Sequence, residues 1–150
     1  MTKILMVCLG NICRSPLAEG ILKSKLDSKK FFIDSAGTAD YHSGELPDYR
    51  SIKVAGENKI DLTHQRARQI KPVDFELFDL IYAMDQSVYD DLLKMAKTDF
   101  EKQKVRLILN EVFPNEDMDV PDPYYESIYA FRNVYKMLDN ACNIIAKKID

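Results

Sequence analysis

Residues 3 to 15 read KILMVCLGNICRS, and this stretch determines both the fold class and the expected place of the chemistry. Residues 3 to 8 form a short apolar run, which predicts a strand that is buried on both faces. A glycine and an asparagine follow. Pro16 then begins a stretch with helical periodicity, because proline is tolerated in the first turn of a helix. The sequence therefore predicts a strand, a tight loop and a helix in succession.

The rest of the chain alternates between strand-like and helix-like patterns. Further strands are expected at residues 31 to 35, 79 to 84 and 105 to 109, and helices at residues 15 to 28, 47 to 57, 86 to 97 and 126 to 149. Residues 114 to 124 contain three prolines and several acids, which indicates a loop. The pattern predicts an α/β fold, a four-stranded parallel sheet flanked by helices on both faces, with ligands bound beyond the carboxyl ends of the strands.

Length and composition fit one domain over residues 1 to 150. The chain is 46% hydrophobic and 30% charged, with a formal net charge of -3. That charge argues against a nucleic-acid partner, whose binding surface is usually basic. No segment has the length of a membrane span, and no secretory leader is visible. We therefore expect neither a nucleic-acid partner nor a membrane partner.

The cysteine pattern indicates the compartment. Cys8, Cys13 and Cys142 are an odd number, and their spacing does not suggest a disulfide framework. Only two histidines are present, and they do not cluster with the cysteines, so no zinc site is expected. A chain with free thiols fits a reducing compartment. We expect a cytoplasmic protein with no metal and no cofactor.

The loop from Cys8 to Ser15 has the features of a phosphate site. Cys8 and Arg14 stand at its two ends with five residues between them. Gly10 permits unusual backbone angles and Asn11 tolerates the left-handed region, so the backbone can curl into an anion nest. The helix that begins near Ser15 directs its positive end at the same point, and Arg14 can grip two phosphate oxygens. The phosphate-binding residues expected here are Leu9, Gly10, Asn11, Ile12, Cys13, Arg14 and Ser15.

The same positive fields favour the thiolate form of Cys8, which is a nucleophile for phosphoryl transfer. Ser15 can donate to this thiolate and stabilise it as a leaving group in a second step. A cysteine that ends a strand is more often a core residue, and the C-x5-R spacing alone is common by chance. The setting between a strand and a helix favours the catalytic interpretation.

The segment VCLGNICRSP at residues 7 to 16 resembles the signature of the low-molecular-weight protein tyrosine phosphatases. Further stretches agree in order: Ile33 to Thr38 (IDSAGT), Leu46 to Tyr49 (LPDY), Thr63 to Gln69 (THQRARQ), Ala83 to Asp85 (AMD) and Asp122 to Tyr125 (DPYY). Together they span nearly the whole chain. The resemblance implies a four-stranded parallel sheet and metal-independent hydrolysis of phosphotyrosine through a cysteinyl-phosphate intermediate.

The resemblance also assigns an acid. Asp122 lies between Pro121 and Pro123, and taken alone it would be a turn residue. The family pattern makes it the proton donor to the leaving oxygen and the base that later activates water. The implied partner is a phosphotyrosine protein or a small aryl phosphate, and the implied product is inorganic phosphate.

Residues around the loop receive roles from the resemblance as well. The aromatic side chains that are expected to wall the mouth of the site are Tyr41, Tyr124 and Tyr125. Ile12 lines the same entrance and favours phosphotyrosine, because relatives that act on phosphoarginine tend to carry threonine there. Ser35 and His64 are expected to hold the loop in shape through Asn11. Without the resemblance, a strand-end serine and a surface histidine would be the simpler interpretations.

Three alternative functions fit the residues less well. Arsenate reductases share this fold and loop, but they need further cysteines to relay a disulfide, and none lies between Cys13 and Cys142. A phosphoarginine phosphatase would differ chiefly at Ile12. A phosphotyrosine-binding module without activity would require the loss of Cys8 or Asp122, and both are present.

Overall fold

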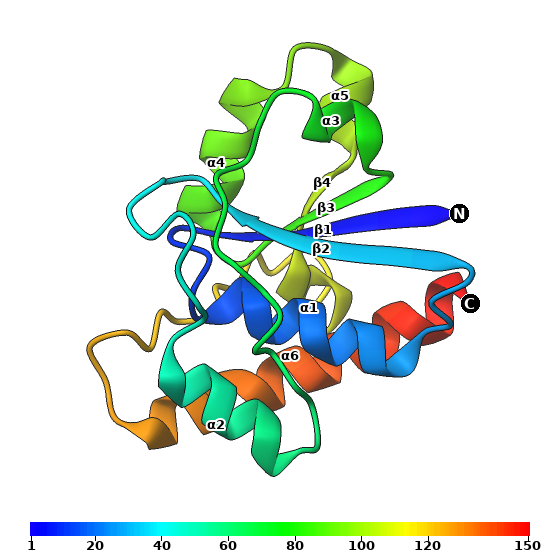
Figure 1. Ribbon diagram of the computed structural model, residues 1–150. Coiled ribbons are helices and arrows are strands. Elements are labelled where there is room, and N and C mark those ends of the chain that lie inside the picture. Colours follow the sequence, from blue (N-terminus) through cyan, green and yellow to red (C-terminus); the bar gives the residue numbers. More distant parts are fainter.

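A computed structural model describes all 150 residues of the chain (Figure 1). Four parallel strands form one sheet in the order β2-β1-β3-β4. The strands are β1 (Thr2–Cys8), β2 (Phe31–Gly37), β3 (Leu80–Ala83) and β4 (Val105–Leu107). The four-stranded parallel sheet predicted from the sequence is thereby confirmed.

Helices cover both faces of the sheet. They are α1 (Arg14–Lys25), α2 (Tyr49–Glu57), α3 (Asp74–Leu77), α4 (Gln86–Met95), α5 (Asp99–Gln103), the short 3-10 helix η1 (Ile108–Glu111) and α6 (Ile128–Ile149). Figure 1 shows α1, α2 and α6 on one side of the sheet and α3, α4 and α5 on the other. The predicted arrangement, with helices on both faces, is also confirmed.

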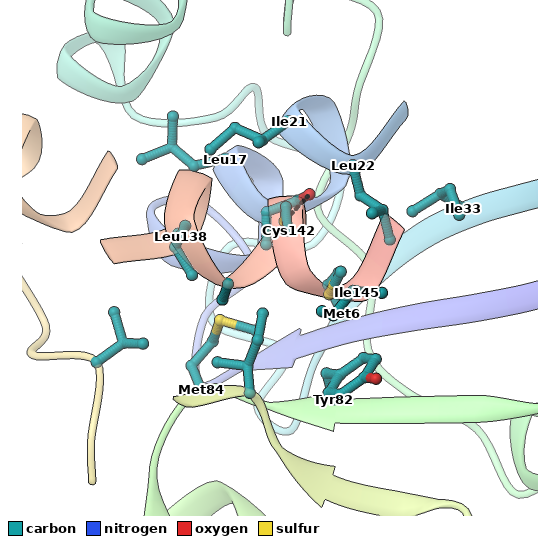
Figure 2. Packing of buried hydrophobic residues seen from close by; sticks show 14 of the residues in the cluster. Met6, Leu17, Ile21, Leu22, Ile33, Tyr82, Met84, Leu138, Cys142 and Ile145 are labelled. Carbon is teal, nitrogen blue, oxygen red and sulfur yellow. Dashed lines mark hydrogen bonds between the residues drawn. The ribbon is translucent and has the colours of Figure 1, made fainter. Parts of the chain in front are cut away.

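The central strand β1 is buried on both faces, as its apolar sequence predicts. Ile4 and Met6 belong to the larger core cluster, which lies between the sheet and helices α1 and α6. Leu5 and Val7 point to the opposite side and belong to the cluster below α4. Figure 2 shows side chains of α1 and α6 beside Met6 of β1, Tyr82 of β3 and Met84, which follows β3. Burial of each large apolar side chain stabilises the fold by roughly 1.5–3 kcal/mol.

Some boundaries differ from those expected. The strand predicted at residues 105 to 109 ends at Leu107, because the next four residues form η1. The helix predicted to reach residue 28 ends at Lys25, and Leu26 has extended backbone angles. Helices α3 and α5 were not expected, since four and five residues are too few to show a helical period.

The carboxyl ends of the strands mark the position of the site. The chain after β1 enters α1, and the neighbours of β1 on its two sides are β2 and β3. In open parallel sheets, ligands bind beyond the carboxyl ends of the strands, which is where the loop after β1 lies. Figure 1 shows that the segment after β2 and the orange segment before α6 extend past this same end. None of the helices is both long and apolar enough to span a membrane.

Candidate active site

The loop after β1 turns sharply between Cys8 and Arg14. Asn11 has a φ of 57°, in the left-handed region that asparagine tolerates. Gly10, by contrast, does not have a positive φ, so the expectation of unusual backbone angles there is wrong. A side chain at Gly10 would instead place its Cβ 3.2 Å from Cδ2 of His42. Gly10 therefore allows the segment after β2 to approach the loop closely.

The sulfur of Cys8 is surrounded by donors. The backbone N–H of Asn11 donates to it over 3.2 Å, and Ser15 Oγ lies 3.0 Å away. Asn11 Nδ2 donates to the same Ser15 Oγ over 2.8 Å, which leaves the serine hydroxyl hydrogen free to point at the sulfur. Four further N–H groups of the loop have no acceptor within the protein, those of Leu9, Gly10, Ile12 and Cys13. Unpaired donors of this kind can bind an anion.

A hydrogen-bond network fixes the left-handed turn. Asn11 Nδ2 also donates to Ser35 Oγ over 3.0 Å, and Ser35 donates to Glu19 Oε1 over 2.7 Å. The backbone N–H of Arg68 donates to Asn11 Oδ1 over 3.0 Å. Ser35 therefore lies where the sequence predicts. His64 does not, because its side chain is exposed and bonds to neither Asn11 nor Ser35.

The network contains Glu19 instead of His64, and the sequence analysis did not predict this residue. Glu19 has a side chain that is almost completely buried on α1, where Lys23 Nζ lies 2.6 Å from its second oxygen. The sequence does indicate an unusual position for Glu19, because this acid lies inside the apolar run from Leu17 to Leu22. A buried carboxylate needs donors, and Ser35 and Lys23 supply them.

Arg14 is buried and held by its Nη1 nitrogen. Nη1 donates to Asp85 Oδ2 over 2.7 Å and to the carbonyl oxygen of Val120 over 2.8 Å. Nε and Nη2, which have no acceptor within hydrogen-bond distance, are left for two phosphate oxygens. Burial alone would lower the pKa of Arg14, but Cys8 and Asp85 raise it above its ordinary value. The guanidinium therefore remains a cation.

Asp85 is a second functional residue that sequence reasoning missed. Its Oδ1 accepts from the backbone N–H of Val88 over 2.8 Å and so caps α4, while its Oδ2 accepts from Arg14. The signal is its position two residues after the end of β3, at the same edge of the sheet as Cys8. Strand ends of a parallel sheet converge there, so an acid after β3 can meet a cation after β1.

Asp122 lies in the irregular segment before α6. Its Oδ2 is 3.9 Å from Arg14 Nη2, and its Oδ1 accepts from the backbone N–H of Tyr124 over 3.1 Å. The side chain is 47% exposed, so substrate can reach it. The structure thus brings an acid from residue 122 to an arginine from residue 14, across the mouth of the loop.

A cleft of about 180 Å³ opens over the loop. Its walls are formed by Cys8, Leu9, Gly10, Ile12, Cys13, Arg14, Tyr41, His42, Asp122, Tyr124 and Tyr125. The rings of Tyr124 and Tyr125 meet edge to face at 4.9 Å, and His42, which sequence reasoning missed, packs 6.2 Å from Tyr124. Asn11, Ser15 and Ser35 are buried and do not line the cleft. A larger hollow of about 480 Å³ beside α2 and α6 is lined by no cysteine, so the cleft at Cys8 is the candidate site.

Known proteins resemble the chain over its whole length. The family model described as low molecular weight phosphotyrosine protein phosphatase matches residues 3–150. A low molecular weight phosphotyrosine protein phosphatase of Homo sapiens is 37% identical over 150 residues, covering 97% of this chain and 94% of that protein. A protein tyrosine phosphatase of Entamoeba histolytica has a TM-score of 0.93 at 36% identity, covering 99% and 97% of the two chains. Vibrio vulnificus Wzb, in complex with benzylphosphonate, has a TM-score of 0.89 at 32% identity, covering 99% of each chain. The chain therefore belongs to the low molecular weight phosphotyrosine protein phosphatase family and is a protein-tyrosine phosphatase.

Proposed function

We propose that Cys8 is the nucleophile, that Arg14 and the loop N–H groups bind the phosphate, and that Asp122 transfers the proton. The observation that supports this most directly is the sulfur of Cys8, which lies at the floor of the cleft with donors from Asn11 and Ser15. A thiolate that receives these hydrogen bonds is a nucleophile for phosphorus.

The reaction takes two steps. In the first, Cys8 Sγ forms a bond to phosphorus while the bond to the tyrosine oxygen breaks, and Asp122 gives its proton to that oxygen. In the second, Asp122 takes a proton from water, which attacks phosphorus and releases inorganic phosphate. Ser15 stabilises the departing thiolate of Cys8. Arg14 binds the charged oxygens throughout, with the two donor nitrogens that Asp85 and Val120 leave free.

The shape of the cleft supports an aryl substrate. Tyr41, Tyr124 and Tyr125 line its entrance, and Ile12 adds an apolar wall. A phenyl ring can lie between these side chains, whereas a phosphoserine is too short to bring its phosphate to the floor. Benzylphosphonate, the molecule bound to Wzb, has this combination of ring and phosphorus group. The substrate is a phosphotyrosine protein or a small aryl phosphate, encountered in the cytoplasm.

The test compares kcat/KM on phosphotyrosine, phosphoserine and phosphoarginine peptides of the same sequence, with a chelator present. We expect hydrolysis of phosphotyrosine alone. Cys8→Ser should abolish turnover and still bind phosphate, because an alkoxide is much harder to form than a thiolate while the donors of the loop remain. Substantial activity of Cys8→Ser would refute the covalent mechanism. Preference for phosphoarginine would refute the role given to Ile12.

A further inference from the structure

The segment that carries Asp122 is fixed at two points, one on each side of the acid. On the amino-terminal side, Val120 donates its N–H to the carbonyl oxygen of Met84 over 2.9 Å. The carbonyl oxygen of Val120 accepts from Arg14 Nη1 over 2.8 Å. This first anchor belongs to the phosphate site itself.

The second anchor is Arg50, which lies on α2 and does not line the cleft. Its Nη2 donates to the carbonyl oxygen of Tyr124 over 2.9 Å, and its Nη1 donates to that of Glu126 over 2.8 Å. No other side chain outside residues 121 to 127 forms a hydrogen bond to them. The anchored residue is the one whose N–H binds the carboxylate of Asp122.

Arg50 is itself rigidly held. Its Nε and Nη2 donate to the two oxygens of Asp48 over 3.0 and 2.9 Å, and Asp48 caps the start of α2. Its guanidinium lies 4.3 Å from the ring centre of Phe131 on α6. Burial would raise the pKa of Asp48, but the hydrogen bonds from Arg50 outweigh it and lower that pKa. The pair therefore stays ionised at neutral pH.

We propose that Arg50 is a positioning residue for proton transfer, which holds Asp122 over the leaving oxygen by binding the carbonyl oxygens of Tyr124 and Glu126. The inference rests on the proposed role of Asp122 as the proton donor. Apart from the long contact with Arg14, the carboxylate of Asp122 has one hydrogen bond, to the N–H of Tyr124. Its place therefore depends on the backbone that Arg50 anchors.

The expected effect is selective for proton transfer. A general acid must come within about 2.6–3.2 Å of the atom that it protonates. Displacement by 1 Å can lower a rate by about 10²-fold. Loss of Arg50 should therefore reduce the reaction of substrates whose leaving oxygen needs a proton, and leave nearly unchanged those whose leaving group departs as an anion.

The experiment measures kcat/KM of Arg50→Ala and Arg50→Lys on phenyl phosphate and on 2,4-dinitrophenyl phosphate. For Arg50→Ala we expect a loss of about 10- to 100-fold on phenyl phosphate and less than about threefold on the dinitrophenyl ester. Arg50→Lys should be intermediate, because a single ammonium cannot bind two carbonyl oxygens and a carboxylate in the same plane. Thermal unfolding identifies any variant that fails to fold. If Arg50→Ala does not fold, the kinetics of Arg50→Lys alone test the proposal.

Arg132→Ala is the matched control. Arg132 on α6 makes a two-bond ion pair with Glu57 on α2, over 3.0 and 2.8 Å, and contacts nothing in the segment of Asp122. Its removal should leave the ratio of the two substrates unchanged. Combining Arg50→Ala with Asp122→Asn supplies the second readout. If Arg50 acts through Asp122, the double variant should be less than about twofold slower on phenyl phosphate than Asp122→Asn alone.

The outcomes separate two failures. Equal losses of Arg50→Ala on both esters, or losses that multiply with those of Asp122→Asn, overturn the positioning role while Asp122 remains the acid. If Asp122→Asn loses the same factor on both esters, the assignment of the acid fails, and the role of Arg50 fails with it.

Discussion

At the scale of single residues, the site is defined by donors and carboxylates that the protein itself leaves free. Nε and Nη2 of Arg14 and the N–H groups of the loop have no acceptor, and Asp122 is half exposed beside them. Donors that the protein leaves unpaired on the wall of a cleft can bind an anion.

Asp122→Asn provides the first prediction. An amide keeps the oxygen that accepts from the N–H of Tyr124, but it cannot give a proton to the leaving group. We expect kcat/KM on phosphotyrosine to fall by roughly 10²–10⁴-fold, with a smaller loss on esters of acidic phenols. Kinetics on a series of aryl phosphates measure this. If Asp119→Asn shows the stronger dependence on the leaving group, that acid is the donor instead.

Oxidation of Cys8 provides the second prediction. Burial raises the pKa of the Cys13 thiol, and the Asp48 carboxylate adds to the rise, so Cys13 is protonated at neutral pH. After peroxide converts Cys8 to a sulfenic acid, the Cys13 sulfur can condense with it to a disulfide and release water. The attacking form is the thiolate, whose fraction grows with pH below the pKa. The ratio of disulfide to sulfinic acid should therefore rise between about pH 6 and pH 8.

Mass spectrometry of peroxide-treated protein quantifies both products. Cys13→Ser should keep basal turnover and recover poorly with dithiothreitol. Cys142→Ser is the control, since Cys142 lies on α6, where burial raises its pKa to about 12. Equal recovery of Cys13→Ser and the unchanged protein would show that Cys13 is only a packing residue.

At the scale of elements, Asp85 couples a helix to the phosphate site, and this gives the third prediction. Asp85→Ala removes the cap of α4 and leaves the buried guanidinium of Arg14 without its carboxylate. Loss of a cap costs about 1 kcal/mol, and breaking a buried ion pair costs roughly 3–5 kcal/mol. Asp85→Asn can retain the capping oxygen but not the charge. We expect both variants to bind phosphate more weakly, and the alanine variant to be the less stable.

Urea unfolding and phosphate titration measure these two effects. Thr98→Ala is the control, because Thr98 caps α5 through the N–H of Glu101 over 3.1 Å, away from the site. It should lower stability by about 0.5–2 kcal/mol and leave phosphate affinity unchanged. Normal phosphate affinity of Asp85→Asn would show that Arg14 needs no carboxylate partner.

The elements were predictable where the pattern was long. The apolar run of β1 and the stripe of α6 are strong signals, and both elements lie within two residues of the predicted bounds. Leu107 to Leu109 remained apolar past the end of β4, so composition could not reveal that the backbone turns into η1 there. Element ends depend on tertiary contacts that a local pattern does not contain.

The site was predictable where one segment carries it. The loop around Cys8 is continuous in sequence, and its strand–loop–helix order could be inferred directly. Asp85, Glu19 and Arg50 come from other elements, and a single acid or arginine in a helix or at its start is usually a surface residue. His64 was misplaced because the sequence does not show which side of a bend faces the protein, and the structure leaves it exposed.

At the scale of the whole molecule, the two core clusters share the sheet. The larger cluster includes Ile4 and Met6, and the smaller cluster includes Leu5 and Val7. Any displacement of β1 therefore disrupts both clusters. The site lies at the end of this strand, where its loop forms hydrogen bonds with several later parts of the chain. Phosphate binding and global stability should therefore be coupled.

This coupling gives the last prediction, that residues 1 to 150 unfold as one unit which phosphate stabilises as a whole. Far-ultraviolet circular dichroism and the fluorescence of the eight tyrosines should show coincident transitions. Phosphate at about 100 times its dissociation constant should add about 2.7 kcal/mol, which raises the Tm by roughly 5–10 °C for a chain of this size. Chloride at equal ionic strength is the control, and Arg14→Lys should lose most of the shift because a point charge cannot replace the planar fork. Two separate transitions, or a phosphate effect on only one probe, would contradict a single cooperative domain.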